Sequence, residues 1–196
     1  MHYGKIKKNN GILTRRDFLN CASLAMIGSV ALPKELVAKT SIASLFESRD
    51  YKSLKLYNLN TSEKLNITYF ENGMYVADAL MEINKIMADR RSGEMIKMDK
   101  ELIELLYKVQ TISESHEPIN IISAYRSPNT NQRMHDKERS VAQNSYHTRG
   151  MAIDINIQNR SLKDIRKIAK ELQMGGVGYY PRSNFVHVDV GPVRTW

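Results

Sequence analysis

Hydrophobic and polar residues alternate along several short segments of the chain, which is the pattern of a strand with one buried face. LKLYNLNTSEKLNITYF contains two such runs around a Thr-Ser-Glu turn, and MAIDINI and NFVHVDVG each contain one. A fourth segment, INIISAYRS, starts as an apolar run and ends in polar residues. We therefore expect a hairpin within residues 54–70 and strands within residues 119–127, 151–157 and 184–191.

Apolar residues recur every three or four positions in other segments, as they do on one face of a helix. This spacing predicts a helix within residues 74–91 and a second one after Asp99, which is placed to cap it. Pro128 favours the start of a third helix. A fourth helix opens at Ser161 and should end at the Gly-Gly pair at 175–176, because glycine readily adopts the left-handed conformation found at helix ends.

Strands and helices are mixed along the chain without internal repeats. A chain of 196 residues is long enough for one domain with its own core. We therefore predict an α+β fold, a single small domain at residues 53–196 in which helices pack around an antiparallel sheet that carries the candidate site. Residues 39–52 are polar and are expected to form a flexible lead-in.

The first 38 residues differ in composition from the rest. A basic, polar opening leads to the arginine pair in TRRDFL and then to an uncharged stretch, residues 21–33, that is rich in Ala, Leu, Ile, Val and Ser. This order is typical of an export signal, and TRRDFL resembles the twin-arginine type. The uncharged stretch is too short to span a bilayer as a helix. We expect residues 1–38 to be removed on export to the periplasm, leaving no stable membrane span; a membrane anchor and a chance basic run are the alternatives.

Removal of the signal changes the charge and the cysteine count. Residues 1–38 carry six Lys or Arg and two Asp or Glu, so the formal net charge falls from +8 to +4. A mildly basic protein suits an anionic cell wall, and no nucleic-acid partner is expected. Cys21 is the only cysteine, so the mature chain has no disulfide and no thiolate nucleophile. A lipoprotein role for Cys21 is disfavoured because the apolar stretch follows this residue.

Two alternating strands each place one residue with metal-binding chemistry opposite their Ile or Val face. They are Asp154 in MAIDINI and His187 in NFVHVDVG. If these strands are antiparallel neighbours, the two side chains converge, and His147, in the loop before the first strand, can join them. Two imidazoles, a carboxylate and an open position are the ligand set of catalytic Zn²⁺, which activates water and polarises a carbonyl. The alternative is that His147 bonds to the backbone and Asp154 closes a turn.

Three further matches point to a known family: SAYRS, HTRGMAID and VGYYPRSNFVHVD. They resemble the zinc peptidoglycan peptidases of the D-alanyl-D-alanine carboxypeptidase superfamily, in which an S-x-x-R strand, an H-x6-D pair and a late histidine on a strand form the active site. The twin-arginine-like leader, ADALMEINKIMADRRSGE and the terminal HVDVGPVRTW are similar to the murein endopeptidase K type. The resemblance covers about residues 14–196.

The resemblance implies a role for each matching residue. His147, Asp154 and His187 would bind Zn²⁺. Arg126, three residues after Ser123, would hold a substrate carbonyl or carboxylate and stabilise the developing oxyanion, as a guanidinium can. A structural salt bridge is the alternative role for Arg126.

The general base departs from the wider pattern of the family. Many relatives carry Glu or Asp three residues before the last histidine, where this chain has Asn184, which cannot take a proton from water. Asp189, two residues after His187 on the same strand face, is the best remaining carboxylate and the predicted proton acceptor. The alternative is that Asp189 orients His187 through its other ring nitrogen.

The predicted function is zinc-dependent hydrolysis of amide bonds in the peptide cross-links of the cell wall by a murein endopeptidase. Its expected partners are peptidoglycan stem peptides and cross-links, and the chain is expected to act as a monomer. A D,D- or L,D-carboxypeptidase that trims stem peptides and a catalytically silent wall-binding protein are the alternatives. No H-E-x-x-H, P-loop or G-x-S-x-G motif is present, so zincin, phosphoryl-transfer and serine-hydrolase functions lose support.

Overall fold

The computed structural model describes residues 50–138 and 141–196. The predicted export signal lies outside these residues, as do residues 39–49 of the predicted lead-in. The first strand, β1, begins at Tyr51, two residues before the predicted start of the domain. No helix in the two described ranges is both long enough and apolar enough to cross a membrane.

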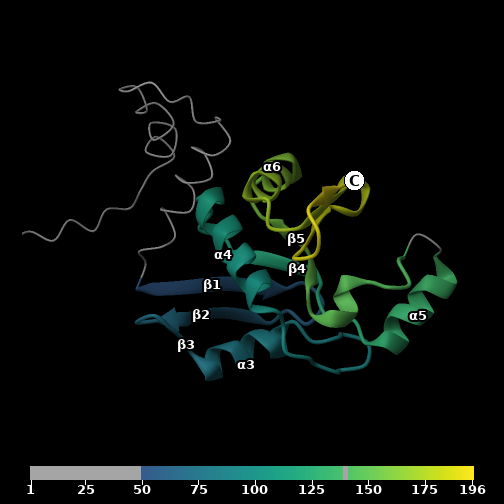
Figure 1. The fold of residues 1–196 in the computed structure, drawn as a ribbon, viewed down its shortest axis with the longest axis horizontal. Coiled ribbons are helices and arrows are strands. Elements are labelled where there is room, and N and C mark those ends of the chain that lie inside the picture. The colour runs from purple at the N-terminus through teal and green to yellow at the C-terminus, as the bar shows by residue number, and fades with distance from the viewer. Residues whose placement is uncertain (1–49, 139–140) are drawn as a thin grey trace, which may run out of the picture. The chain divides into compact units, whose positions relative to one another are not determined.

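The described residues form one eight-stranded sheet with helices packed around it, in agreement with the predicted α+β class (Figure 1). The strand order is β3-β2-β1-β4-β5-β7-β6-β8. Neighbouring strands are antiparallel except for two pairs, β1 with β4 and β6 with β8. The strands are β1 (Tyr51–Asn58), β2 (Lys64–Glu71), β3 (Met74–Tyr75), β4 (Ile119–Ser123), β5 (Ala152–Ile157), β6 (Gly176–Tyr180), β7 (Phe185–Asp189) and β8 (Arg194–Thr195).

Two helices that contact each other, α4 and α6, cover the central part of the sheet. α4 packs on β1, and α6 packs on β5, β6 and β7, while α3 packs on β2. Figure 1 shows α4 lying across β1. The helices are α3 (Ala77–Ile86), α4 (Lys100–Ser113), α5 (Pro128–Lys137) and α6 (Leu162–Leu172), with two short 3₁₀ helices, η1 (Tyr146–Arg149) and η2 (Pro181–Ser183).

Side-chain caps begin three helices where the sequence predicted them. Asp99, Ser127 and Ser161 each accept a hydrogen bond from a backbone N–H in the first turn of α4, α5 and α6. Each such cap stabilises a helix by about 1 kcal/mol. The helix predicted from residue 74 starts later, because Met74 pairs in the β2–β3 hairpin and α3 begins at Ala77.

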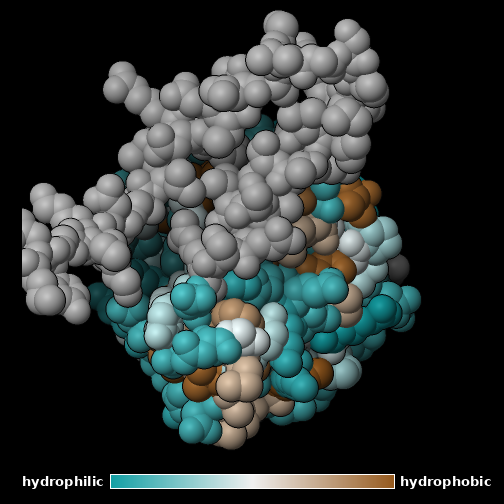
Figure 2. Space-filling view, turned by 60° about the vertical axis from the view of Figure 1, so that its left-hand side comes forward, coloured by the Kyte–Doolittle hydropathy of each residue, from teal (hydrophilic) through white to brown (hydrophobic). Residues whose placement is uncertain are grey.

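The hydrophobic core lies between the sheet and the α4–α6 pair. The apolar stripe of α4 is buried as predicted, and so are the apolar faces of β5 and β7. Each fully buried aliphatic side chain contributes about 1.5–3 kcal/mol. Where described residues are visible in Figure 2, the surface is mostly hydrophilic with scattered hydrophobic residues. The core side chains of α4, β5 and β7 are Leu102, Leu105, Leu106, Val109, Ile153, Ile155, Ile157, Val186 and Val188.

α6 ends before the glycine pair that was predicted to stop it. Gln173 adopts the left-handed conformation, with φ of +51°, and closes the helix. The glycines serve a close approach instead. A Cβ atom on Gly175 would collide with the backbone of Asp189, and one on Gly176 would collide with the side chains of Asp189 and Arg194. The pair therefore lets β6 pack against a polar cluster on β7 and β8.

Candidate metal centre

β5 and β7 bring two of the predicted ligands together. The strands are antiparallel neighbours, and Asp154 is directly opposite His187 in their register. Directly opposed residues of an antiparallel pair share one face of the sheet and lie within contact distance. Asp154 and His187 therefore lie together on the face opposite Ile153 and Ile155, as the alternation of the two strands predicted.

His147 reaches the same point from the 3₁₀ helix η1. The hydroxyl of Ser145 accepts the backbone N–H of His147 and starts the helix, and Gly150 ends it with φ of +68°. His147 is only 1% exposed, and its Nδ1 donates to the carbonyl oxygen of Ala124 at 2.6 Å. Since a carbonyl can only accept, the proton is on Nδ1, and Nε2 has a free lone pair.

The three side chains converge on one point. His147 Nε2 lies 3.4 Å from Asp154 Oδ1 and 3.2 Å from His187 Nδ1, and His187 Nδ1 lies 2.9 Å from Asp154 Oδ1. Atoms bound to one tetrahedral ion at about 2.1 Å lie about 3.4 Å from one another. The donor atoms therefore have the type and the spacing that a single metal ion needs. Within the described ranges, this is the one group of three or more such side chains close enough to share an ion.

The protonation states of two of the three groups, Asp154 and His147, suit a metal. Burial alone would raise the pKa of Asp154, but His147 and His187 hold that pKa well below its usual range. Burial lowers the pKa of His147, which favours the neutral imidazole that binds metals. Burial acts on His187 in the same direction, but hydrogen bonds to Asp154 and Asp189 raise its pKa overall. The centre thus contains an ionised carboxylate next to a neutral imidazole.

Asp189 is fully buried and accepts hydrogen bonds on both carboxylate oxygens. Oδ1 accepts from the backbone N–H groups of Gly176 and Gly191 at 3.1 and 2.9 Å and from Arg194 Nη1 at 3.0 Å. Oδ2 accepts from Arg194 Nη2 at 2.7 Å and from His187 Nε2 at 3.0 Å. Burial would raise the pKa of Asp189, but His187 and Arg194 hold it well below its usual range. These contacts favour the second of its two predicted roles, orientation of His187.

Sequence reasoning missed two residues beside His187. Arg194 lies between the rings of Tyr146 and Trp196, at 5.2 and 4.9 Å from their centroids, while it pairs with Asp189. The ring of Trp196 lies 5.3 Å from that of His187. The short spacing from Asp189 to Arg194 was the available signal, because an arginine five residues after a strand carboxylate can fold back onto it.

Arg126 lies beside the three converging side chains. An irregular register between Ile121 and Ser123 ends the pairing of β4 next to Asp154, and the N–H of Arg126 donates to the carbonyl of His147 at 3.2 Å. Its Nη2 lies 3.9 Å from Asp154 Oδ2. The two groups form a long ion pair, in line with the alternative role predicted for Arg126, and this pair places the guanidinium next to the three converging side chains.

The backbone conformation at position 184 favours asparagine there. It follows η2 with φ of +56°, a left-handed conformation that asparagine tolerates better than most residues. Its carbonyl oxygen accepts from Asn156 Nδ2 at 2.9 Å. Asn184, where the family resemblance led us to expect a carboxylate, therefore shapes the turn into β7.

Comparison with known proteins gives one consistent match. A family model described as peptidoglycan L,D-endopeptidase MepK matches residues 47–196. The peptidoglycan L,D-endopeptidase MepK of Escherichia coli (strain K12) is 38% identical over 177 residues, which are 90% of this chain and 97% of that protein. The probable peptidoglycan L,D-endopeptidase MepK of Haemophilus influenzae is 36% identical over 183 residues, which are 93% and 95% of the two chains.

Proposed function

The chain belongs to the peptidoglycan L,D-endopeptidase MepK family, and on that premise we propose that it is a zinc-dependent L,D-endopeptidase. It is a metallopeptidase that hydrolyses amide bonds in the peptide cross-links of murein. The observation that carries the zinc proposal is the convergence of His147 Nε2, His187 Nδ1 and Asp154 Oδ1 within 3.4 Å of one another. Two imidazoles and one carboxylate with an open position favour zinc over magnesium or calcium, which prefer oxygen ligands.

His147, Asp154 and His187 would hold the ion. When bound, zinc supplies a Lewis acid and a water molecule of lowered pKa. Residues of the chain itself orient the two imidazoles. Ala124 fixes the tautomer of His147, and Asp189 fixes that of His187, so that each imidazole presents its unprotonated nitrogen to the centre.

Arg126 is placed to act on the substrate. Its guanidinium lies beside the proposed ligand Asp154, and its side chain is 11% exposed, so it would meet the scissile carbonyl in a site with little water. A fixed positive charge in such a site stabilises the oxyanion that develops on the carbonyl oxygen more strongly than it would in bulk water. Arg126 therefore contributes both substrate positioning and charge stabilisation.

The substrate places the enzyme outside the cytoplasmic membrane, because peptidoglycan lies there. Residues 1–38 serve as a twin-arginine export signal in this proposal, supported by the arginine pair of TRRDFL and the short apolar stretch after it. A reporter fused after residue 38 tests it. Export that stops in cells without the twin-arginine translocase, and on replacement of Arg15 and Arg16 by lysine, supports the signal; export through the general secretory route contradicts it.

One experiment tests the reaction and the metal together. The purified protein is analysed for bound metal and incubated with intact sacculi, and the released muropeptides are identified by mass spectrometry. We expect about one zinc per chain and cleaved cross-links, with both lost in His187→Ala. Products trimmed at free stem ends, from uncross-linked muropeptides, would indicate a carboxypeptidase instead. Wall binding without turnover at any metal content would refute the enzymatic proposal.

A further inference from the structure

Two exposed aromatic side chains meet beside the candidate metal centre. Among the described residues, the aromatic side chains with large exposure are Tyr51, Tyr180 and Trp196. The last two are in contact, because the indole Nε1 of Trp196 donates to the hydroxyl of Tyr180 at 2.7 Å. The Trp196 ring also lies 5.3 Å from the ring of His187. Tyr180 and Trp196, called the aromatic pair below, therefore leave apolar surface open next to one of the three converging side chains.

Strand register places Tyr180 on the same face of the sheet as the candidate centre. In the pairing of β6 with β7, Gly178 is directly opposite His187. Two residues along, Tyr180 is directly opposite Phe185. Directly opposed residues share a face, and so do residues two apart in a strand. The rings of Tyr180 and Phe185 stack with centroids 4.6 Å apart, so this face continues from His187 as an aromatic surface.

Trp196 is held in place from several directions. Its backbone N–H donates to Val177 at 3.2 Å, and its carbonyl accepts from Tyr179 at 3.1 Å. Gly178 leaves the space for the ring, since a Cβ atom there would lie 2.7 Å from Cε2 of Trp196. The guanidinium of Arg194 lies 4.9 Å from the ring centroid. Trp196 is nevertheless 46% exposed. A fixed, exposed ring loses little conformational entropy when a ligand packs on it.

The contacts of the indole leave apolar carbon for a ligand. Its single donor, Nε1, already bonds to Tyr180. A cationic ligand is disfavoured, because the positive charge of Arg194 already lies against the ring. An aliphatic chain is the chemistry that fits, since it gains free energy when an apolar surface removes it from water.

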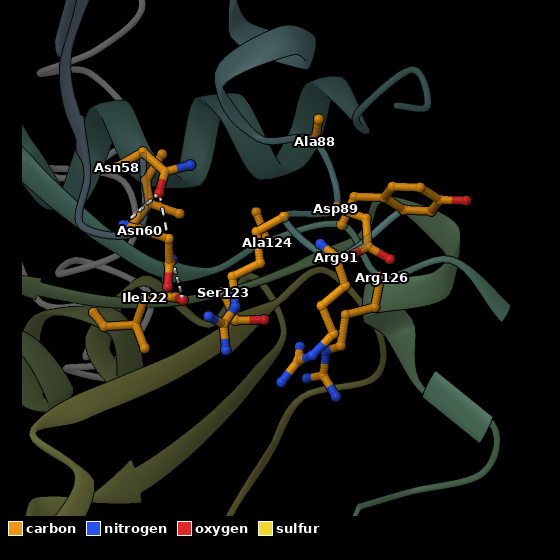
Figure 3. Close-up of a pocket in the computed structure, with 12 residues that line it drawn as sticks. Asn58, Asn60, Ala88, Asp89, Arg91, Ile122, Ser123, Ala124 and Arg126 are labelled. Carbon is orange, nitrogen blue, oxygen red and sulfur yellow. Dashed lines mark hydrogen bonds between the residues drawn. The ribbon is translucent and has the colours of Figure 1, made fainter. Parts of the chain in front are cut away.

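A ligand on the aromatic pair would lie within one or two residues of the reacting amide. The Trp196 ring is 5.3 Å from that of His187, and an extended peptide advances about 3.3–3.6 Å per residue. Arg126, which lines the small pocket in Figure 3, borders the same place. Burial lowers the pKa of Arg126, and among the smaller effects Tyr180 raises it. The glycan strand is joined to the far end of the stem peptide, so a sugar ring fits this position less well.

We propose that Tyr180 and Trp196 bind the methylene chain of the diamino acid next to the scissile amide. In murein, stem peptides are joined through a diamino acid whose side chain is a run of methylene groups. The aromatic pair would select the cross-link by this chain, whereas the proposed metal and Arg126 act on the amide itself. The inference rests on the proposed function and extends it from the reaction to selection of the substrate.

Two synthetic cross-linked dimers test the selection. One has the natural diamino acid next to the scissile amide, and in the other this chain is two methylenes shorter. We expect the wild-type kcat/KM to be about 10-fold lower for the shorter chain, since each methylene removed from water contributes a few-fold. Trp196→Ala should lower kcat/KM for the natural dimer and remove the discrimination. Trp196→Phe should recover part of it, because phenylalanine keeps an aromatic ring.

A matched control uses the third exposed aromatic side chain. Tyr51→Ala removes a ring from β1 and should keep the full discrimination. An equal loss of kcat/KM on both dimers in Trp196→Ala would assign Trp196 to the packing of His187 and overturn the proposal. Equal kcat/KM of the wild type for the two dimers would also overturn it.

Tryptophan fluorescence separates this proposal from the proposed function. Trp196 is the only tryptophan of the chain, so its emission reports on this position alone. Stem peptides with the natural and the shorter chain are titrated into the wild-type protein while acrylamide quenches the emission. The natural peptide should protect Trp196 at about a 10-fold lower concentration. Such protection supports the proposal even where no cross-link is cut, an outcome that refutes the proposed function alone.

The same titration includes a murein disaccharide without a peptide. It should leave the quenching of Trp196 unchanged, because the proposed ligand is a side chain of the stem peptide. Protection by the disaccharide and not by the peptides would assign the aromatic pair to the glycan strand and overturn the proposal. Equal protection by the natural and the shorter peptide would overturn it as well.

Discussion

Asp189 links His187 to Arg194 through one buried carboxylate. Its side chain is 0% exposed, and both oxygens already accept hydrogen bonds. A water molecule that loses its proton to Asp189 would have to displace one of these donors. Asp189 is better placed to hold the imidazole so that Nδ1 faces Asp154.

We expect Asp189→Asn to lower zinc affinity by about 10- to 100-fold, because the amide cannot accept on both sides as the carboxylate does. The measurement is competition with a chromogenic chelator, with circular dichroism to confirm the fold. Asp136→Asn changes a carboxylate that bonds Gln132 on α5 and should bind zinc as the wild type does. Unchanged affinity with a reduced kcat would instead identify Asp189 as the proton acceptor.

Among the single residues of the site, the convergence of Asp154 and His187 could be predicted, because strand alternation assigns each side chain to a definite face. The surroundings of Asp189 could not, because its donors belong to β6, β8 and a turn that meet it only in the fold. The bridge made by Asp89 was equally hidden, because Asp89 accepts from the backbone N–H groups of Arg91 and Ser127, which are far apart in the chain.

The turn after α3 and the start of α5 are joined by Asp89. Burial would raise the pKa of this carboxyl, but hydrogen bonds from Thr130, Arg91 and Ser127 lower it from 3.8 to about 2. Because the folded-state pKa lies below the unfolded-state value, the ionised carboxylate stabilises the fold above about pH 4. This stabilisation is lost as the pH falls from about 4 to 2, and at neutral pH it amounts to about 2 kcal/mol.

Asp89→Asn is therefore expected to reduce the free energy of unfolding by about 2 kcal/mol at pH 7, and by about 1 kcal/mol near pH 3. Urea unfolding at both pH values measures the difference. Glu94→Gln, an exposed change in the same turn, should have little effect at either pH. A difference between Asp89→Asn and the wild type that stays constant with pH would contradict an ionised bridge.

Most elements could be predicted, because strands with period two and helices with Asp or Ser caps are signals within a few residues. The exceptions are instructive. β3 and β8 contain two residues each, too few to show a period. The parallel pairing of β1 with β4 joins segments about 60 residues apart, and no local pattern reports it. α6 ends at the left-handed Gln173, whereas the glycines beyond it lie against Asp189.

At the scale of the whole molecule, we expect metal binding and folding to be coupled. The three proposed ligands come from η1, β5 and β7, so their donor atoms meet only after the sheet and the loop before β5 have packed. An ion that binds the folded chain and not the unfolded chain stabilises the fold by mass action. The size of this effect depends on how far the free metal concentration exceeds the Kd.

We expect zinc at about 1,000 times its Kd to stabilise the domain by about 4 kcal/mol and to raise the Tm by about 8–16 °C. Scanning calorimetry with added zinc and with a chelator measures the shift. His187→Ala should remove it, because two ligands do not hold the ion in a closed site. His135→Ala should keep it, since Nδ1 of His135 bonds the carbonyl of Val141 outside the centre. An equal shift in both variants would place the stabilising zinc elsewhere on the chain, because only the first variant alters a donor of the proposed centre.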